Sequence, residues 1–234
     1  MADYDYTHKA WTKFSAVKDL QSPNVKVLQG TVTNVDCVAK QVAYLPQGCQ
    51  LQQVIDYDYM VVSTGMRRDW PVVPRSVTYS DYLHEVGNHI EQLQDAQYGV
   101  VVVGGGAVGI EVAAELKLVM PHLKVTLVHS REKLMSSEPL TDECKQRALE
   151  VLRRANVDVI LNRRFVIQEP IKTPDSTGKY QVNFSDGSHM QASAVVMAIS
   201  NGVPSTHFLP TTALDEQGYV RIRANRATSS KIPS

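Results

Sequence analysis

The sequence feature that most constrains the fold is a glycine-rich segment, residues 98–115, which lies between a run of valines and a helical pattern. The four consecutive valines Val100–Val103 predict a strand that is buried on both faces, as in a parallel sheet. Glycines break this run, and apolar residues then recur at helical spacing from position 112 to position 119. The order of strand, glycine turn and helix predicts a βαβ unit that binds a dinucleotide.

Three of the glycines complete the pattern G-x-G-x-x-G, and each has a physical reason. Gly104 permits a tight turn, Gly106 lets the backbone approach a pyrophosphate, and Gly109 lets the helix pack close to the strand. Free N–H groups and the helix dipole favour phosphates at the start of the helix. The predicted phosphate loop consists of Gly104, Gly105, Gly106, Ala107, Val108 and Gly109. The alternative is a glycine-rich turn that binds no ligand.

A second predicted strand, residues 124–128, is followed by His129, Ser130 and Arg131. In NAD-specific sites an acidic residue at this tip binds the ribose 2′-hydroxyl, but here the first carboxylate is Glu132. An imidazole, a hydroxyl and a guanidinium suit a 2′-phosphate at least as well as a bare ribose. We therefore expect NADPH to be accepted and even preferred. The alternative is that these are ordinary exposed residues after a strand.

Apolar spacing and turn residues predict the other elements. Helices are expected over residues 79–96, with Ser80 as N-cap, and over 141–155, with Thr141 as N-cap. The apolar stripe expected on the second helix is Cys144, Ala148, Val151, Leu152 and Ala155. Strands are expected over residues 24–36, 57–65, 157–161 and 194–199, with a hairpin over 41–55 and an antiparallel meander after 165. His84 and His89, five apart on the first helix, are expected to be solvated.

These elements predict an α/β fold with a Rossmann-like βαβαβ unit and an appended antiparallel meander. The 24 basic and 24 acidic residues give a net charge of zero, which argues against nucleic acid as a main partner. The three cysteines form no C-x-x-C pair, so neither a disulfide framework nor a metal site is indicated. Without a signal peptide or a run of about 20 apolar residues, we expect an intracellular protein, cytoplasmic or peripheral on a membrane, and not a secreted one.

Four stretches of the sequence carry a resemblance to a known family. They are residues 57–65 (YDYMVVSTG), 104–111 (GGGAVGIE), 185–199 (SDGSHMQASAVVMAI) and 214–220 (LDEQGYV). Together they resemble the FAD- and NAD(P)-dependent pyridine nucleotide oxidoreductases, which are flavoproteins with two dinucleotide-binding domains. The ending Val128-His129-Ser130 is most similar to the ferroptosis-suppressor type of apoptosis-inducing-factor-like enzyme, a branch of NAD(P)H:quinone reductases.

The resemblance implies hydride transfer from NAD(P)H to FAD, with electrons passing on to a small-molecule acceptor, a quinone. It places Glu111 as the catalytic residue near the nicotinamide and flavin, and Thr64 and Gly65 near the flavin. The alternatives are a surface glutamate on the helix and a plain turn after a strand. It also implies an NAD(P)H-binding domain over residues 76–204, inserted in a partial FAD-binding domain over 1–75 that resumes at 205–234.

The sequence departs from the family pattern at both ends. No glycine motif for the FAD pyrophosphate precedes Gly104, and the chain stops at Ser234 before the family's Gly-Asp segment. We therefore expect a truncated product or fragment, with any membrane contact made through a region absent here. The competing hypothesis is a non-catalytic NAD(P)H-binding module, or a fragment that lacks stable FAD.

Overall fold

The computed structural model describes residues 3–67, 70–71, 73–171, 179–199 and 202–222. The chain divides into two compact units. Unit 1 consists of Met1–Trp11 and Arg68–Ile199, and unit 2 consists of Thr12–Arg67 and Ser200–Ser234. Each unit has its own sheet and its own hydrophobic core, so each is described by itself.

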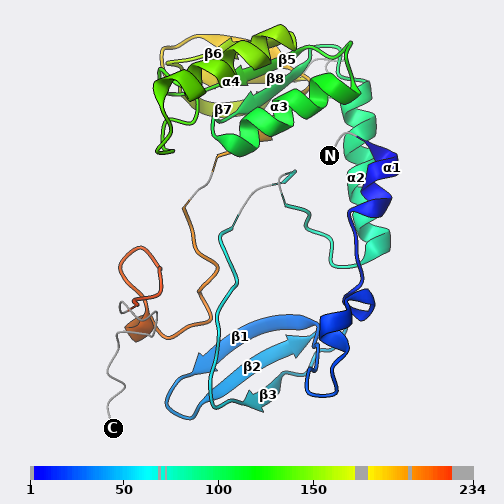
Figure 1. Cartoon of the computed structure of the whole chain (residues 1–234), viewed down its shortest axis with the longest axis vertical. Coiled ribbons are helices and arrows are strands. Elements are labelled where there is room, and N and C mark those ends of the chain that lie inside the picture. The colour runs from blue at the N-terminus through cyan, green and yellow to red at the C-terminus, as the bar shows by residue number, and fades with distance from the viewer. Residues whose placement is uncertain (1–2, 68–69, 72, 172–178, 200–201, 223–234) are drawn as a thin grey trace. The chain divides into compact units, whose positions relative to one another are not determined.

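Unit 1 is built on a parallel sheet with the strand order β10-β4-β5-β6. The strands are β4 (Val100–Val103), β5 (Val125–Val128), β6 (Val157–Ile160) and β10 (Ala194–Met197). Helix α3 (Ala107–Val119) connects β4 to β5, and α4 (Asp142–Arg154) lies between β5 and β6. The predicted βαβαβ unit is therefore confirmed (Figure 1).

The two faces of this sheet are covered by different layers. Val100 and Val102 pack with α2 (Tyr79–Gln94) and α3 in the main core. Val101 and Val103 face the opposite way and pack with Val182 and other residues of an antiparallel meander. The meander consists of β7 (Phe165–Pro170), β8 (Tyr180–Phe184) and β9 (His189–Ala192) and is confirmed (Figure 1). Because both faces are covered, every residue of β4 is buried, which explains the continuous valine run.

The N-terminal helix α1 (Tyr4–Lys9) packs against α2 (Figure 1). The rings of Trp11 and Tyr82 have centroids 5.1 Å apart, and His8 Nδ1 lies 2.9 Å from the hydroxyl of Tyr79. These contacts join residues that are more than 70 positions apart in the sequence, so α1 belongs to unit 1.

The N-cap of α2 was predicted at the wrong residue. Thr78, not Ser80, is the N-cap, and its hydroxyl accepts a hydrogen bond from the N–H of Asp81 at 3.2 Å. A threonine followed three residues later by an acid forms this cap better than Ser80, which lies inside the first turn.

Thr141 is confirmed as the N-cap of α4, but part of the predicted apolar stripe is wrong. The buried residues of α4 are Leu149 and Leu152, whereas Cys144 and Val151 are exposed. Val151 lies about 100° around the helix from Leu152, so both cannot face the sheet.

Unit 2 contains a separate antiparallel sheet with the order β1-β2-β3. Its strands are β1 (Gly30–Asp36), β2 (Gln41–Pro46) and β3 (Gln53–Asp56), and the predicted hairpin between β2 and β3 is confirmed. Short 3-10 helices are η1 (Phe14–Ala16), η2 (Lys18–Gln21) and η3 (Thr211–Ala213). Val35 of β1 packs with Phe208 and Leu209 in the core of this unit.

Two strand predictions in unit 2 are wrong. Residues 24–29 are not a strand, because the ladder with β2 ends where Gly30 pairs with Pro46. Residues 57–65 are not a buried strand either, since Tyr59 is 96% and Val61 is 89% exposed. Met60 and Val62 do pack on the core, but no strand of the described residues pairs with this segment.

Candidate functional site

The glycine turn between β4 and α3 is held by close backbone contacts. Gly104 has a φ of 120°, and a Cβ there would lie 2.7 Å from the carbonyl oxygen of Ala198, which follows β10. A Cβ at Gly109 would overlap the carbonyl oxygen of Gly104. Only glycine fits these two positions, because the turn and the helix approach each other with no room for a side chain.

Gly106 differs from its neighbours because it faces open space. It is the N-cap of α3, with φ −79° and ψ −179°, and no side chain caps the helix. A Cβ at Gly106 would meet no atom within 4 Å. The first N–H groups of a helix, here including those of Ala107 and Val108, have no partner within the helix. This uncapped end with free space in front of it fits the pyrophosphate of a dinucleotide.

Gly105 is held by the segment that follows β5. Its N–H donates to Nδ1 of His129 at 3.1 Å, and its carbonyl oxygen accepts from the N–H of Met135 at 2.7 Å. Nε2 of His129 lies 3.1 Å from the hydroxyl of Ser136. This hydrogen-bonded contact was not predicted, because the glycine and the histidine lie in different loops, 24 residues apart, and no local sequence pattern joins them.

The tip of β5 places its three predicted residues in different surroundings. Ser130 and Arg131 are exposed, whereas His129 is half-buried. Burial and the nearby Arg131 cation lower the pKa of His129 below its usual value. The carbonyl oxygens of His129 and Arg131 accept hydrogen bonds from Arg163 N–H at 3.0 Å and Asn162 N–H at 3.1 Å. The side chains of Ser130 and Arg131 are therefore exposed, while hydrogen bonds fix the backbone of this segment.

The residues predicted to lie near the flavin belong to two units. Glu111 is exposed on α3 of unit 1, one turn beyond the glycine loop. Thr64 and Gly65 are exposed in unit 2. The Thr64 hydroxyl donates to the carbonyl oxygen of Ser205 at 2.8 Å, and Ser205 N–H donates to the carbonyl oxygen of Gly65 at 2.9 Å.

The fit to FAD is partial. Gly65 has a φ of 66° and open space around its Cα, so this turn could face a flavin ring. Residues 12–67 and 202–222, which are the described part of unit 2, contain no α-helix. They therefore present no helix N-terminus to an FAD pyrophosphate.

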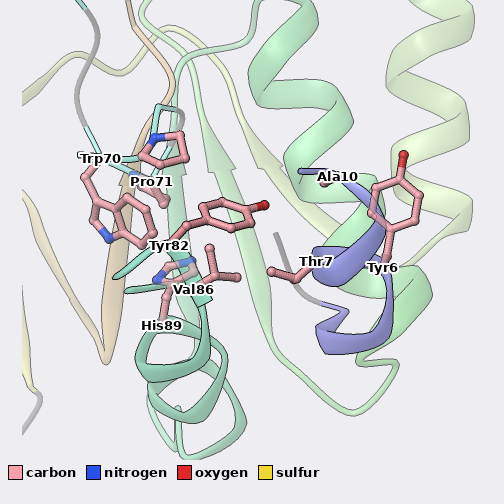
Figure 2. A pocket seen from close by; sticks show the side chains of 9 residues that line it. Tyr6, Thr7, Ala10, Trp70, Pro71, Tyr82, Val86 and His89 are labelled. Carbon is pink, nitrogen blue, oxygen red and sulfur yellow. The ribbon is translucent and has the colours of Figure 1, made fainter. Parts of the chain in front are cut away.

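Unit 1 also contains a mostly apolar cavity of about 250 Å³ beside α2. Figure 2 shows Trp70, Tyr82 and His89 gathered around one part of it, with Tyr6 and Thr7 contributed by α1. The prediction that His89 is solvated is wrong, since it is only 8% exposed and its ring meets Trp70 edge-on at 5.4 Å, whereas His84 is exposed. Burial lowers the pKa of His89 to about 4.

The fold and the glycine turn define a dinucleotide-binding α/β protein. The chain belongs to the pyridine nucleotide-disulphide oxidoreductase family, whose model matches residues 3–232. The members of this family are FAD- and NAD(P)H-dependent oxidoreductases, as the resemblance implied.

Known relatives agree with this family. Oxidoreductase OXR1 of Ajellomyces capsulatus is 43% identical over 234 residues, which cover 100% of this chain and 50% of the relative. Ferroptosis suppressor protein 1 of Mus musculus is 28% identical over 75% of this chain and 45% of the relative. The chain thus spans about half the length of the curated relatives it matches.

Solved structures share the fold. A NAD-dependent persulfide reductase from A. fulgidus is similar with a TM-score of 0.67 and 22% identity, over 92% of this chain and 39% of that chain. In the part of the chain that the structure describes, no helix combines the length and apolarity that crossing a bilayer requires.

Proposed function

We propose that this chain supplies the NAD(P)H-binding part of a flavoprotein that passes a hydride from NAD(P)H to FAD and electrons on to a quinone-like acceptor. The observation that carries the proposal is the glycine turn, in which Gly104 and Gly109 close the turn and Gly106 leaves the start of α3 open. The family membership supports the redox chemistry, and the resemblance to the ferroptosis-suppressor type supports a quinone acceptor.

The chain's own residues have distinct roles in this proposal. The N–H groups at the start of α3 bind the pyrophosphate, and Ser130 and Arg131 bind the ribose or its 2′-phosphate. NADPH is then accepted, and preferred over NADH. Glu111 lies one turn along α3 and orients the nicotinamide. FAD, when bound, accepts the hydride, and the protein contributes binding and orientation.

The visible spectrum of the purified chain, recorded before and after anaerobic addition of NADPH, tests this proposal. A flavin band that bleaches on addition supports the reductase. A colourless protein that still changes NADPH fluorescence reduces the function to coenzyme binding. A protein that shows neither signal contradicts the dinucleotide site itself.

A second candidate is a non-catalytic NAD(P)H-binding module. One observation favours it: the parallel sheet and the glycine turn lie entirely within unit 1, whereas the described part of unit 2 offers no helix to the FAD pyrophosphate. A module of this kind binds NADPH with a defined stoichiometry but does not oxidise it when FAD and a quinone are added.

A further inference from the structure

The segment after β5 forms hydrogen bonds with both the N–H and the carbonyl oxygen of Gly105. Its N–H donates to Nδ1 of His129 at 3.1 Å, and its carbonyl oxygen accepts from the N–H of Met135 at 2.7 Å. A Cβ at Gly105 would lie 2.7 Å from Cγ of His129 and 2.7 Å from Cδ2 of Leu134. The absence of a side chain at Gly105 is thus what allows the imidazole to reach the loop backbone.

This contact sets the protonation state of the imidazole. A backbone N–H can only donate, so Nδ1 of His129 must carry a lone pair. The ring proton then lies on Nε2, which donates to the Ser136 hydroxyl at 3.1 Å. Both ring nitrogens are engaged inside the protein, so His129 has none left for a ribose hydroxyl or a 2′-phosphate.

We propose that His129 is a positioning residue, which in its neutral form holds the glycine loop in the conformation that opens the start of α3 to the coenzyme pyrophosphate. Ser130 and Arg131, which are exposed, then discriminate between a ribose hydroxyl and a 2′-phosphate. The inference rests on the proposed NAD(P)H site. It replaces the expectation that His129 itself contacts the 2′-phosphate.

A proton on Nδ1 would place a donor against the Gly105 donor and break the contact. The Arg131 cation disfavours a charged ring, whereas a hydrogen bond with the backbone of Lys133 favours it. Glu132 lies between them in the sequence, and Arg163 N–H donates to the carbonyl oxygen of His129 at 3.0 Å. Lys133 pairs with Asp142 at 2.8 Å and Arg163 with Asp186 at 3.1 Å. Burial and the Arg131 cation keep the pKa of His129 below its usual value, so the loop is held at neutral pH and released on acidification.

The test measures the affinity of the full chain for ADP-ribose by calorimetry between pH 5.5 and pH 8. ADP-ribose carries the pyrophosphate but lacks a 2′-phosphate, so the probe does not titrate in this range. We expect the affinity of the wild-type chain to begin to fall at the acidic end of this range, towards an about tenfold loss once His129 is protonated, because one hydrogen bond to the loop is lost. Loss of ADP-ribose binding at every pH would contradict the proposed site itself rather than the role of His129.

Two variants and one control isolate the imidazole. His129→Leu removes the acceptor and weakens binding about tenfold at pH 8. His129→Asn offers a carbonyl oxygen close to the position of Nδ1 but does not titrate, so it recovers most of that affinity and loses the pH dependence. His122→Asn, at an exposed histidine between α3 and β5, keeps the wild-type profile.

The variants also define what would overturn the inference. Wild-type affinity in His129→Leu, or an unchanged pH profile in His129→Asn, contradicts it. If His129→Leu fails to fold, the pH profile of His129→Asn alone decides. Arg131→Ala should lower the ratio of NADPH to NADH affinity about tenfold, because it removes a charge-assisted contact, while His129→Asn should leave that ratio unchanged. A changed ratio in His129→Asn would indicate that His129 itself contacts the 2′-phosphate, and would contradict the inference.

Discussion

Gly109 occupies the tightest position in the coenzyme loop. A methyl group there would overlap the carbonyl oxygen of Gly104, so Gly109→Ala must displace backbone atoms. We expect a loss of about 2 kcal/mol in the free energy of unfolding, measured by urea denaturation. Gly87→Ala is the matched control, because its Cβ in α2 would only make ordinary contact with Tyr4 at 3.4 Å. Equal stability of the two variants would contradict the close approach.

His89 gives a prediction for the pH dependence of stability. Its pKa is lowered to about 4 in the folded chain, against about 6.5 when unfolded. Between these values the unfolded chain binds the proton and the folded chain does not. The free energy of unfolding therefore falls as the pH falls from 6.5 towards 4, by up to about 3 kcal/mol from this group.

The substitution His89→Phe isolates this effect, because it keeps a ring beside Trp70 and does not titrate. Its urea midpoint should change less with pH than that of the wild-type chain. His84→Phe, at an exposed histidine of the same helix, should retain the wild-type dependence. If both variants follow the wild-type curve, His89 is not a buried neutral group.

The burial of His89 was predictable from information within the sequence. Val86, His89, Ile90 and Leu93 follow the i, i+3, i+4, i+7 spacing of one helical face, and all four are buried. The spacing of five residues between His84 and His89 does not reveal this face, whereas the apolar residues around His89 do. By contrast, the contact between His129 and Gly105 depends on two loops meeting, which no local spacing reveals.

At the scale of elements, the N-cap of α2 offers a direct comparison. Thr78→Ala removes the acceptor of the Asp81 N–H, so we expect it to lower the free energy of unfolding by about 1 kcal/mol. Ser80→Ala, two residues further along in the first turn, should change stability by less than about 0.5 kcal/mol. Urea midpoints followed by circular dichroism measure both. A larger effect at Ser80 than at Thr78 would indicate that Ser80 is the N-cap of α2.

The elements that were predicted well are those whose partners are close in the sequence. The βαβαβ unit and the meander follow from consecutive patterns, because each element packs on the next. Residues 57–65 have an equally strong apolar pattern, and one side of the segment does pack on a core. A strand also needs a backbone partner, and the apolar pattern of a single segment carries no information about one.

At the scale of the whole molecule, the division of the chain was harder to predict than its sheets. Residues 4–11 pack with a helix that begins at Tyr79, through Trp11 and Tyr82, although a distinct unit lies between them in the sequence. The assignment of FAD and NAD(P)H to the expected domains stays a prediction. Within unit 1, however, the glycine turn has the close contacts at Gly104 and Gly109 and the open space at Gly106 that a dinucleotide site requires.

The measurement that tests this account most directly is the NADPH affinity of Gly106→Val, followed by fluorescence beside its unfolding curve. A Cβ at this position meets no protein atom within 4 Å and the extended backbone suits a β-branched residue, but the valine side chain fills the space before α3. We predict stability within about 1 kcal/mol of the wild-type chain and affinity at least about tenfold weaker. A folded Gly106→Val that binds NADPH as tightly as the wild-type chain would contradict the coenzyme site.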